Sequence, residues 1–485
     1  MHIVFISAEV YPFSKVGGLG DVVGTLPAAL ARAGHRVQVI SPRYSNISIP
    51  EHHLQNRQID FTVRIGEKSH SSQILSRPAE DIPNLEFIFI EQMKMFGTRG
   101  IYTDARGNPY PDNPERFLLL SRAALQYLQK QQTDVDIIHC HDNHTALVPV
   151  YHKEVTQPPQ LARARTILTL HNIAYQGTVS ADQQQLFGLP QSFFQPGGAL
   201  EWYGQINPLK AGILYADRVT TVSPTHAVEI SEDEAMSAGM KSVIAKRSDQ
   251  LIGILNGVDY DEWHPNNDRY ITHNYHLKNY VAGKRNNKIA LLSETALDPG
   301  LLEKPLIGMV SRLVEQKGIN ILIDAMSEFL QEDVAMVLLG SGEQRYHQAL
   351  EKIAGQYPEK LSIVFGYRND LSHKIMAGSD LFLMPSRYEP CGITQMYSLK
   401  YGTVPIVRKT GGLADTIGDW NGQEGNGIVF TEYTGEALVK AVRRAIRIYY
   451  NQPGQWRAMI RNGMQSDFSW TKAAADYIRL YQNLY

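Results

Sequence analysis

Short runs of apolar residues alternate with longer amphipathic stretches from the start of the chain. His2–Ile6 and Arg36–Ile40 predict buried strands, and the stretch between them, which ends at Ala33 before Gly34, predicts a helix. Pro27 lies inside that stretch, so the helix either kinks there or begins there. A strand, a helix and a second strand in this order predict a βαβ unit with parallel strands that are buried on both faces.

The same alternation continues in two successive series. Further strands of the first series are predicted at Asp136–His139, Thr166–Leu170, Arg218–Val222 and Leu251–Leu255. Those of the second are predicted at Pro305–Val310, Val334–Leu339, Leu361–Phe365, Asp380–Met384, Thr403–Val407 and Gly427–Phe430. A polar, irregular segment between them, Trp263–Asp268, looks like a linker. Two such series predict an α/β protein with two doubly wound, Rossmann-like domains.

Composition and charge exclude several classes of protein. The 485 residues exceed what one hydrophobic core supports, which agrees with two domains. The formal net charge is −2 and no long basic run occurs, so we expect no nucleic-acid partner. The two cysteines, Cys140 and Cys391, have no metal-ligand or disulfide spacing, which favours a reducing compartment. We read no signal peptide and no apolar run of about 18 residues, so we expect a soluble intracellular protein without membrane contact.

Polar and charged residues follow the predicted strands, and open parallel sheets bind ligands at that edge. In the first series these residues are Lys15 with its glycine loop, His141, Asp142, His171, Asn172, Asn256 and Gly257. In the second series they are Arg312, Lys317, Glu389 and Gly392. The sequence therefore predicts a polar site at the carboxyl ends of both sheets.

The loop after the first strand is suited to an anion. Gly17 and Gly18 let backbone N–H groups approach closely, the following helix adds partial positive charge, and Lys15 adds a full charge. The alternative is a tight strand-to-helix turn with a solvated lysine. The pattern of Lys15–Asp21 recurs at Lys409–Asp415, once in each series, although such an echo can also reflect turn chemistry alone.

Arg312 and Lys317 lie five residues apart between a predicted strand and a helix. A forked guanidinium and a point charge together suit a diphosphate, whereas the alternative is a surface loop in which they pair with Glu315. Gly340–Glu343 offers a weaker hydroxyl-binding option. The acids of Asp134–Asp136 precede their strand, at the wrong edge of the sheet for a metal site, and we predict no metal ligands.

Glu389 lies in a turn with Pro390 and Gly392 just before a predicted helix. A carboxylate beside a backbone anion site can handle a sugar hydroxyl and a leaving phosphate together, although a solvated loop acid is the alternative. His171 could be a buried core histidine, but Asn172 beside it and Asp142 on a neighbouring strand end favour a polar pocket.

These segments together resemble bacterial glycogen synthases and plant starch synthases. The motifs that carry the resemblance span nearly the whole chain in family order: Lys15–Leu19, His139–Asp142, His171–Asn172, Asn256–Asp259, Ser311–Leu313, Gln316–Gly318, Glu389–Gly392 and Thr410–Leu413. The first and the Glu389 motif are the specific ones. Many bacterial members carry an aromatic residue where this chain has Asn143, and this departure concerns acceptor affinity and not the donor chemistry.

The resemblance implies the GT-B fold, in which two Rossmann-like domains close over a deep cleft. It places the N-terminal domain at residues 1–258 with a returning segment at 467–485, and the nucleotide-sugar domain at residues 259–466. It implies retaining transfer of glucose from ADP-glucose to the non-reducing end of an α-1,4-glucan (glycogen, starch or maltooligosaccharides), with no metal or other cofactor. The compartment would be a cytoplasm or a plastid stroma.

The resemblance also implies roles, residue by residue. Lys15, Gly17 and Gly18 approach the donor phosphate and glucan ends. Asp142, His171 and Asn256 line the glucose pocket, Arg312 and Lys317 hold the diphosphate, and Glu389 contacts the transferring glucose. Donor binding further involves Gly392, Thr394, Tyr367 as a ring stacked on the base, and Cys391 as a small packed residue. Asp21, Tyr102, His141 and Asn172 are assigned to the acceptor side.

Two rival functions stay open at this level. One is a related retaining enzyme with another acceptor, such as a sucrose synthase or a lipid or small-molecule glucosyltransferase, although such enzymes lack the Lys15–Leu19 motif. The other is a catalytically silent glucan-binding scaffold, which would have no reason to keep Lys15, Arg312, Lys317 and Glu389 together.

Overall fold

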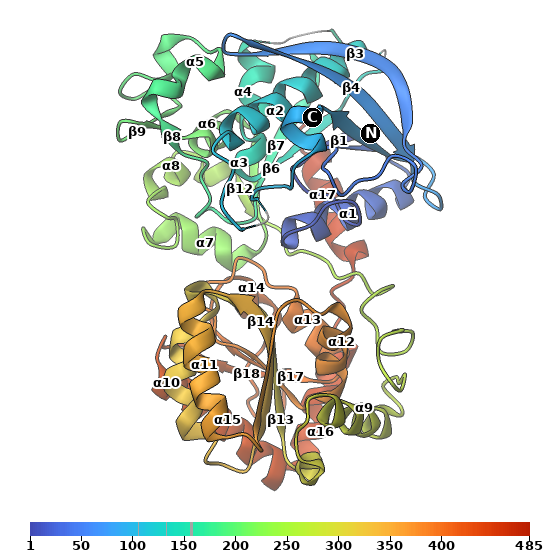
Figure 1. The fold of residues 1–485 in the computed structure, drawn as a ribbon, viewed down its shortest axis with the longest axis vertical. Helices are drawn as coiled ribbons and strands as arrows, with labels where there is room; N and C mark the ends of the chain where they lie inside the picture. The colour runs from blue at the N-terminus through green and yellow to red at the C-terminus, as the bar shows by residue number, and fades with distance from the viewer. Residues whose placement is uncertain (105, 132, 156–158) are drawn as a thin grey trace. The chain divides into compact units, whose positions relative to one another are not determined.

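A computed structural model describes residues 1–104, 106–131, 133–155 and 159–485. The chain forms two compact units, each of which is an α/β fold (Figure 1). The first unit contains Met1–Gly257 and Trp470–Tyr485, and the second contains Val258–Ser469. The predicted α/β fold class is confirmed.

Within the described residues, the first unit is built on a nine-stranded sheet. Its strands, in spatial order, are β12 (Leu251–Gly253), β11 (Arg218–Thr221), β7 (Arg165–Leu170), β6 (Ile137–His141), β1 (His2–Ile6), β2 (Arg36–Pro42), β5 (Leu85–Glu91), β4 (Lys68–Pro78) and β3 (Gln55–Ile65). The strands from β12 to β5 pair in parallel, and β4 and β3 continue the sheet antiparallel. A small sheet of β8 (Val179–Ser180), β10 (Gln205–Ile206) and β9 (Glu201–Trp202) lies apart from it.

The central strands are buried along their whole length because helices cover the parallel part of the sheet. Every residue of β1 and of β6 is buried. The helices of the first unit are α1 (Gly18–Arg32), α2 (Asn113–Lys130), α3 (Asp142–Thr145), α4 (Leu147–Glu154), α5 (Gln184–Phe187), α6 (Pro208–Tyr215), α7 (Pro224–Glu232), α8 (Lys241–Ala245) and α17 (Trp470–Gln482). Helix α1 begins at Gly18, and Pro27 lies within it, which decides the question that the sequence left open.

Helix α17 completes the first unit although it comes from the far end of the chain. It packs beside α1, as the red and blue helices in Figure 1 show. Its Tyr481 and Tyr477 are buried, and the ring of Trp470 contacts Gly257 so closely that a Cβ there would lie 2.5 Å from Trp470 Cδ2.

The second unit contains a six-stranded, wholly parallel sheet within the described residues. Its strands, in spatial order, are β15 (Leu361–Phe365), β14 (Ala335–Gly342), β13 (Leu306–Leu313), β16 (Leu381–Met384), β17 (Val404–Arg408) and β18 (Ile428–Phe430). Helices α10 (Ile319–Phe329), α11 (Gln344–Gln356) and α15 (Gly435–Asn451) cover one face of this sheet in Figure 1. Helices α9 (Tyr280–Glu294), α12 (Asn369–Gly378), α13 (Thr394–Lys400) and α16 (Pro453–Gln465) cover the other, and α14 (Gly411–Thr416) follows β17.

Several predicted boundaries differ from the structure. The strands β6, β13 and β14 run two or three residues further than predicted, so His141, Arg312 and Gly340–Gly342 belong to strands and not to loops. The strand predicted at Leu251–Leu255 ends at Gly253. These extensions reflect hydrogen bonding to a neighbouring strand, which continues past the last apolar residue.

The segment Trp263–Asp268 is not an exposed linker. The Trp263 ring stacks on His373 at 3.7 Å and on Tyr397 at 4.1 Å between ring centroids. Asp268 is buried and accepts hydrogen bonds from His373 Nδ1 at 2.8 Å and from the Tyr401 hydroxyl at 2.5 Å. The prediction was wrong because polar residues that satisfy one another inside a fold have the composition of a loop.

Candidate active site

Strand order reverses at one place in each main sheet, and ligands of such folds bind at the carboxyl ends of the strands there. In the first unit, β1 lies between β2 and β6, so the loops after β1 and β6 start side by side. In the second unit, β13 lies between β14 and β16 in the same way. The predicted residues Lys15, Asp142, Lys317 and Glu389 follow β1, β6, β13 and β16, and others follow β7, β12 and β15.

The glycine loop after β1 is organised by a residue that the sequence reading missed. Glu9 is buried, and its Oε2 accepts hydrogen bonds from the backbone N–H of Val16 at 2.6 Å and of Gly17 at 3.0 Å. The Tyr102 hydroxyl donates to Glu9 Oε1 at 2.6 Å. In this structure two N–H groups of the loop therefore donate to the carboxylate of Glu9.

Lys15 lies at the surface of the same loop. Its Nζ forms an ion pair with Asp21 Oδ1 at 2.6 Å, and both side chains are partly exposed. A Cβ at Gly17 would meet open space, so packing does not require a glycine there. Because 39% of its side chain is exposed, Lys15 is accessible to an anionic ligand.

Asp142 follows β6 and has an unusual backbone, with a φ of 54°. This left-handed conformation is uncommon for residues other than glycine, and strain of this kind often marks functional sites. Its Oδ1 accepts hydrogen bonds from the backbone N–H of His171 at 2.7 Å and of Asn172 at 3.4 Å. The structure thus brings Asp142, His171 and Asn172 together, as the sequence predicted.

Burial sets the charges in this group. It raises the pKa of the Asp142 carboxyl to about 7, against the two backbone hydrogen bonds, and the nearby Glu9 raises it further. Burial lowers the pKa of His171 to about 3 and that of His141 well below its usual value. Because His141 Nδ1 and His171 Nε2 lie 3.0 Å apart, one of these neutral rings donates a hydrogen bond to the other.

Asn256 follows β12 and is buried. Its Oδ1 makes no hydrogen bond to any residue that the structure describes. Buried polar atoms are nearly always paired, so this oxygen is available to a ligand hydroxyl.

In the second unit, the structure joins two residues that lie 72 positions apart. Lys317 Nζ pairs with Glu389 Oε2 at 2.5 Å, and the Ser386 hydroxyl donates to the same oxygen at 3.1 Å. Glu389 is buried, which excludes the solvated loop acid. Arg312 is exposed at the end of β13 and donates to Gln316 Oε1 at 3.3 Å.

The second glycine motif supports the Glu389 loop. The backbone N–H of Gly412 donates to the Glu389 carbonyl at 3.1 Å and is 3.2 Å from the Pro390 carbonyl. A Cβ at Gly412 would overlap the carbonyl oxygen of Cys391. Thr410–Gly412 is therefore a packing surface for the loop, and a side chain there would displace Glu389.

The remaining residues of that loop have different environments. Cys391 is buried, as expected for a small packed residue. Gly392 has a φ of 68°, a conformation that favours glycine, and Gln395 Nε2 donates to its carbonyl at 3.1 Å. Thr394 Oγ1 lies 3.4 Å from Met384 Sδ. Tyr367, just after β15, has 81% of its surface exposed.

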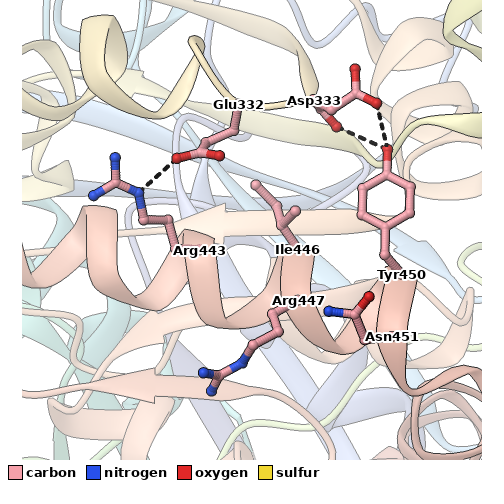
Figure 2. A pocket seen from close by; sticks show the side chains of 7 residues that line it. All are labelled: Glu332, Asp333, Arg443, Ile446, Arg447, Tyr450 and Asn451. Carbon is pink, nitrogen blue, oxygen red and sulfur yellow. Dashed lines mark hydrogen bonds and ion pairs between the residues drawn. The ribbon is translucent and has the colours of Figure 1, made fainter.

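A surface hollow of about 530 Å³ also exists on the second unit (Figure 2). It is lined by Glu332, Asp333, Arg443, Ile446, Arg447, Tyr450 and Asn451. Glu332 and Asp333 precede β14, so the hollow lies at the amino-terminal edge of the sheet, away from Glu389. Arg443 and Tyr450 are already bonded there, to Glu332 and Asp333 respectively.

The residues that the structure describes show neither a metal cluster nor a membrane-spanning helix. No group of three or more histidine, cysteine and acidic side chains is placed to hold a metal ion. In the same ranges, no helix has both the length and the apolar character needed to span a bilayer.

Comparison with known proteins decides the family. The family model of the starch synthase catalytic domain matches residues 2–246, and that of glycosyl transferases group 1 matches residues 298–463. A glycogen synthase from Myxococcus xanthus is 43% identical over 485 residues, which cover 100% of this chain and 99% of that protein. The chain belongs to the glycogen and starch synthase family. It is a glycosyltransferase that makes a storage glucan of this type.

Other members of the glycogen and starch synthase family agree. Glycogen synthase 2 from Geobacter metallireducens is 42% identical, over 99% of this chain and 98% of its own. The catalytic domain of starch synthase IV from Arabidopsis thaliana, solved with ADP and acarbose, is 35% identical with a TM-score of 0.91, over 100% and 99% of the two chains. A sucrose-phosphate synthase from Thermosynechococcus elongatus, 17% identical with a TM-score of 0.62, shares the fold.

Proposed function

We propose that this synthase transfers glucose from ADP-glucose to the non-reducing end of an α-1,4-glucan, with retention of configuration and without a metal. The observation that carries the proposal is the Lys317–Glu389 ion pair at the strand reversal of the second unit, with Arg312 near the end of β13. The related starch synthase domain, solved with ADP and acarbose, supports an adenine nucleotide and a glucan as ligands. The bacterial relatives favour a bacterial cytoplasm over a plastid stroma as the compartment.

Arg312 and Lys317 would bind the diphosphate. Negative charge develops on that group as the glucosyl bond breaks, and fixed cations aimed at it stabilise the transition state without reorganisation. Lys317 neutralises Glu389 in this structure, so a diphosphate would compete with Glu389 for the ammonium group. The Glu389 carboxylate would then be released to contact the hydroxyls of the transferring glucose. The backbone at Gly392 and the Thr394 hydroxyl would complete the phosphate site.

The first unit would supply groups for the sugar. Asp142 and Asn256 offer buried oxygen atoms to hydroxyl groups, and the neutral His171 can bind a hydroxyl without adding charge. His141 is fully buried, so its role would be to orient His171. Lys15 would approach the donor phosphate.

The remaining assignments concern the base and the acceptor. Tyr367 would stack on the adenine ring, because its aromatic face is exposed just beyond β15. On the acceptor side we place Asp21, Tyr102 and Asn172. Asn143 Nδ2 donates to the backbone carbonyl of Tyr175 at 2.9 Å, and 56% of the surface of Tyr175 is exposed.

The test compares donors on the purified protein with a maltooligosaccharide acceptor. We expect kcat/KM to be higher with ADP-glucose than with UDP-glucose, and activity to survive exhaustive EDTA treatment because Arg312 and Lys317 supply the positive charge. A preference for UDP-glucose would contradict the donor assignment. Loss of activity with EDTA that magnesium or manganese restores would contradict the roles of the two cations.

A further inference from the structure

Glu9 is a buried carboxylate beside the proposed site to which no role has yet been given. It follows β1 by three residues, and only 3% of its surface is exposed. A buried carboxylate is costly unless hydrogen bonds or cations compensate it. Among the described residues Glu9 has no ion pair with a lysine or an arginine, and burial raises its pKa. Its compensation comes from the hydrogen bonds that it accepts.

Two of these hydrogen bonds fix the backbone of the glycine loop. The donors are the N–H groups of Val16 and Gly17, which directly follow Lys15. The first turn of α1 closes on the same point, since a Cβ at Gly20 would lie 3.1 Å from Glu9 Oε2 and 3.2 Å from Lys15 Cβ. The carboxylate therefore sets the path of the chain at Lys15.

The other oxygen of Glu9 is held by a residue that is itself fixed. The Tyr102 hydroxyl donates to Oε1, and the segment before Tyr102 is anchored by the fully buried Arg116. The Arg116 guanidinium donates to the carbonyls of Gly100 at 2.7 Å and Ile101 at 2.8 Å. Arg116, Tyr102 and Glu9 form a connected support that ends at the Lys15 loop.

We infer that Glu9 is a positioning residue, whose carboxylate holds the Lys15 loop in its working conformation while Tyr102 holds Glu9. The inference rests on the role proposed for Lys15. Without these hydrogen bonds the loop would sample other conformations, and misplacement of a reactive group by about 1 Å can cost ~100-fold in rate. Glu9 acts through the geometry of the loop and not through contact with substrate.

A double-mutant cycle of Glu9 with Lys15 tests this inference. Glu9→Ala and Lys15→Ala should each lower kcat by about tenfold or more. The double variant should stay within about threefold of Lys15→Ala alone, because a loop without its lysine gains nothing from being positioned. Asp217 is the matched control, because it is a half-buried carboxylate of the same unit that accepts hydrogen bonds from Thr166. The effects of Asp217→Asn and Lys15→Ala on kcat should therefore be additive.

Glu9→Gln separates geometry from charge. Its amide oxygen can accept the hydrogen bonds of Val16 and Gly17, and its NH₂ group can donate to the Tyr102 oxygen, so most of the activity lost in Glu9→Ala should return. Tyr102→Phe should give a smaller loss that is also non-additive with Lys15→Ala, and it serves if Glu9→Ala does not fold.

The outcomes are distinguishable. Additive losses, or a Glu9→Gln variant as inactive as Glu9→Ala, would overturn the positioning role while leaving Lys15 in place. Full activity of Lys15→Ala would refute the role proposed for Lys15, and with it the route through which Glu9 is inferred to act.

Discussion

The Lys317 ammonium and the Glu389 carboxylate depend on each other at the level of single side chains. Without Lys317, the buried Glu389 carboxylate would keep, among the described residues, only the hydrogen bond from Ser386, and the ammonium group at 2.5 Å supplies the compensating charge. The ion pair brings the two opposite charges together inside the second unit, and the diphosphate proposed above would compete with Glu389 for the lysine. Both the stability and the chemistry of the loop therefore depend on one ammonium group.

Lys317→Ala should lower kcat by about 100-fold, because it removes positive charge from the developing diphosphate. It should also lower the thermal midpoint of the second unit, since Glu389 loses its partner. Lys360 is the matched control, because it is a part-buried lysine of the same unit that donates to the carbonyls of Leu330 and Glu332. Lys360→Ala should lose stability with little change in kcat. An unchanged kcat in Lys317→Ala would be evidence against its role.

Asp142 predicts a pH dependence of stability. Its pKa rises from 3.8 to about 7 on folding, so the native state binds a proton that the unfolded chain releases. Its contribution is therefore fully present below about pH 4 and is lost as the pH rises to about 7. Asn accepts the same backbone hydrogen bonds, tolerates the left-handed conformation and does not titrate.

Chemical denaturation of the wild type and of Asp142→Asn at several pH values checks this. The free energy of unfolding of the variant should gain on that of the wild type by up to about 4 kcal/mol between pH 4 and pH 7. Buried histidines such as His171, whose pKa is lowered by burial, make the free energy of unfolding rise with pH. They are common to both proteins, so their contributions cancel in the difference. A difference that stays constant with pH would show that Asp142 is ionised throughout.

At the scale of elements, two glycine motifs with similar sequence patterns make different contacts. Gly17 faces open space, and its N–H binds the side chain of Glu9. Gly412 is packed against the backbone of Glu389–Cys391. The two motifs follow strands in different places of their sheets, because β1 lies at the strand reversal and β17 lies next to the edge strand β18. The echo between the series therefore reflects similar turns, and the surrounding loops decide what each motif supports.

Gly412→Ala should displace the Glu389 loop, because the new methyl group would overlap the Cys391 carbonyl. We expect a loss of at least about tenfold in kcat from this misplacement. Gly355, inside α11, is the matched control, since a Cβ there meets no atom within 4 Å. Gly355→Ala should leave kcat unchanged and stabilise the protein by about 0.5–1 kcal/mol. Equal activity of the two variants would show that the loop tolerates the displacement.

The buried strands were predictable because each is a continuous apolar run between polar residues, as in β1 and β16. The strands β3 to β5 were missed. Most of β3 is exposed, and only Phe61, Val63 and Ile65 alternate into the core. A half-exposed antiparallel strand such as β3 has too few apolar positions to stand out from a loop. This reason does not apply to β5, which is a mostly buried apolar run that pairs in parallel with β2.

The site was predictable as a set of strand ends and not as a set of contacts. Lys317 and Glu389 were each expected near a phosphate, but their pairing depends on β13 and β16 being neighbours. Glu9 was missed because a lone acid after a strand looks like any surface carboxylate. Glu9 is important because it accepts hydrogen bonds from the N–H groups of Val16 and Gly17, and only the folded structure shows which N–H groups lie beside it.

At the scale of the whole molecule, α17 is tied into the first sheet by a chain of hydrogen bonds. The Tyr481 hydroxyl lies 2.8 Å from His139 Nδ1, and His139 Nε2 lies 2.6 Å from Thr169 Oγ1. Thr169 in turn lies 2.6 Å from Thr220 Oγ1. All of these groups are buried, so the chain links the helix to three adjacent strands.

Tyr481→Phe should lower the free energy of unfolding of the first unit by about 1–3 kcal/mol, because it leaves a nitrogen of His139 buried without a partner. The unfolding transition of the second unit should not change. Differential scanning calorimetry checks this, with each transition assigned to its unit by the shift that ligand binding causes. Tyr485→Phe is the control, because the Tyr485 hydroxyl makes a hydrogen bond too, to the backbone carbonyl of Asp136, but 63% of the surface of Tyr485 is exposed. Equal effects of the two changes would contradict a special role for the Tyr481 contact.

The position of α17 in the chain has a consequence for biosynthesis. A ribosome adds about 5–20 residues each second, and domains generally fold as soon as their residues have emerged. The first unit is the exception here, because Trp470, Tyr477 and Tyr481 are made only after Val258–Ser469. Until then the groove for α17 stays uncovered on the nascent chain, where a chaperone can bind it. The second unit is one continuous segment, so all of its residues are made before α17. The half of the protein that is synthesised first is therefore the half that finishes folding last.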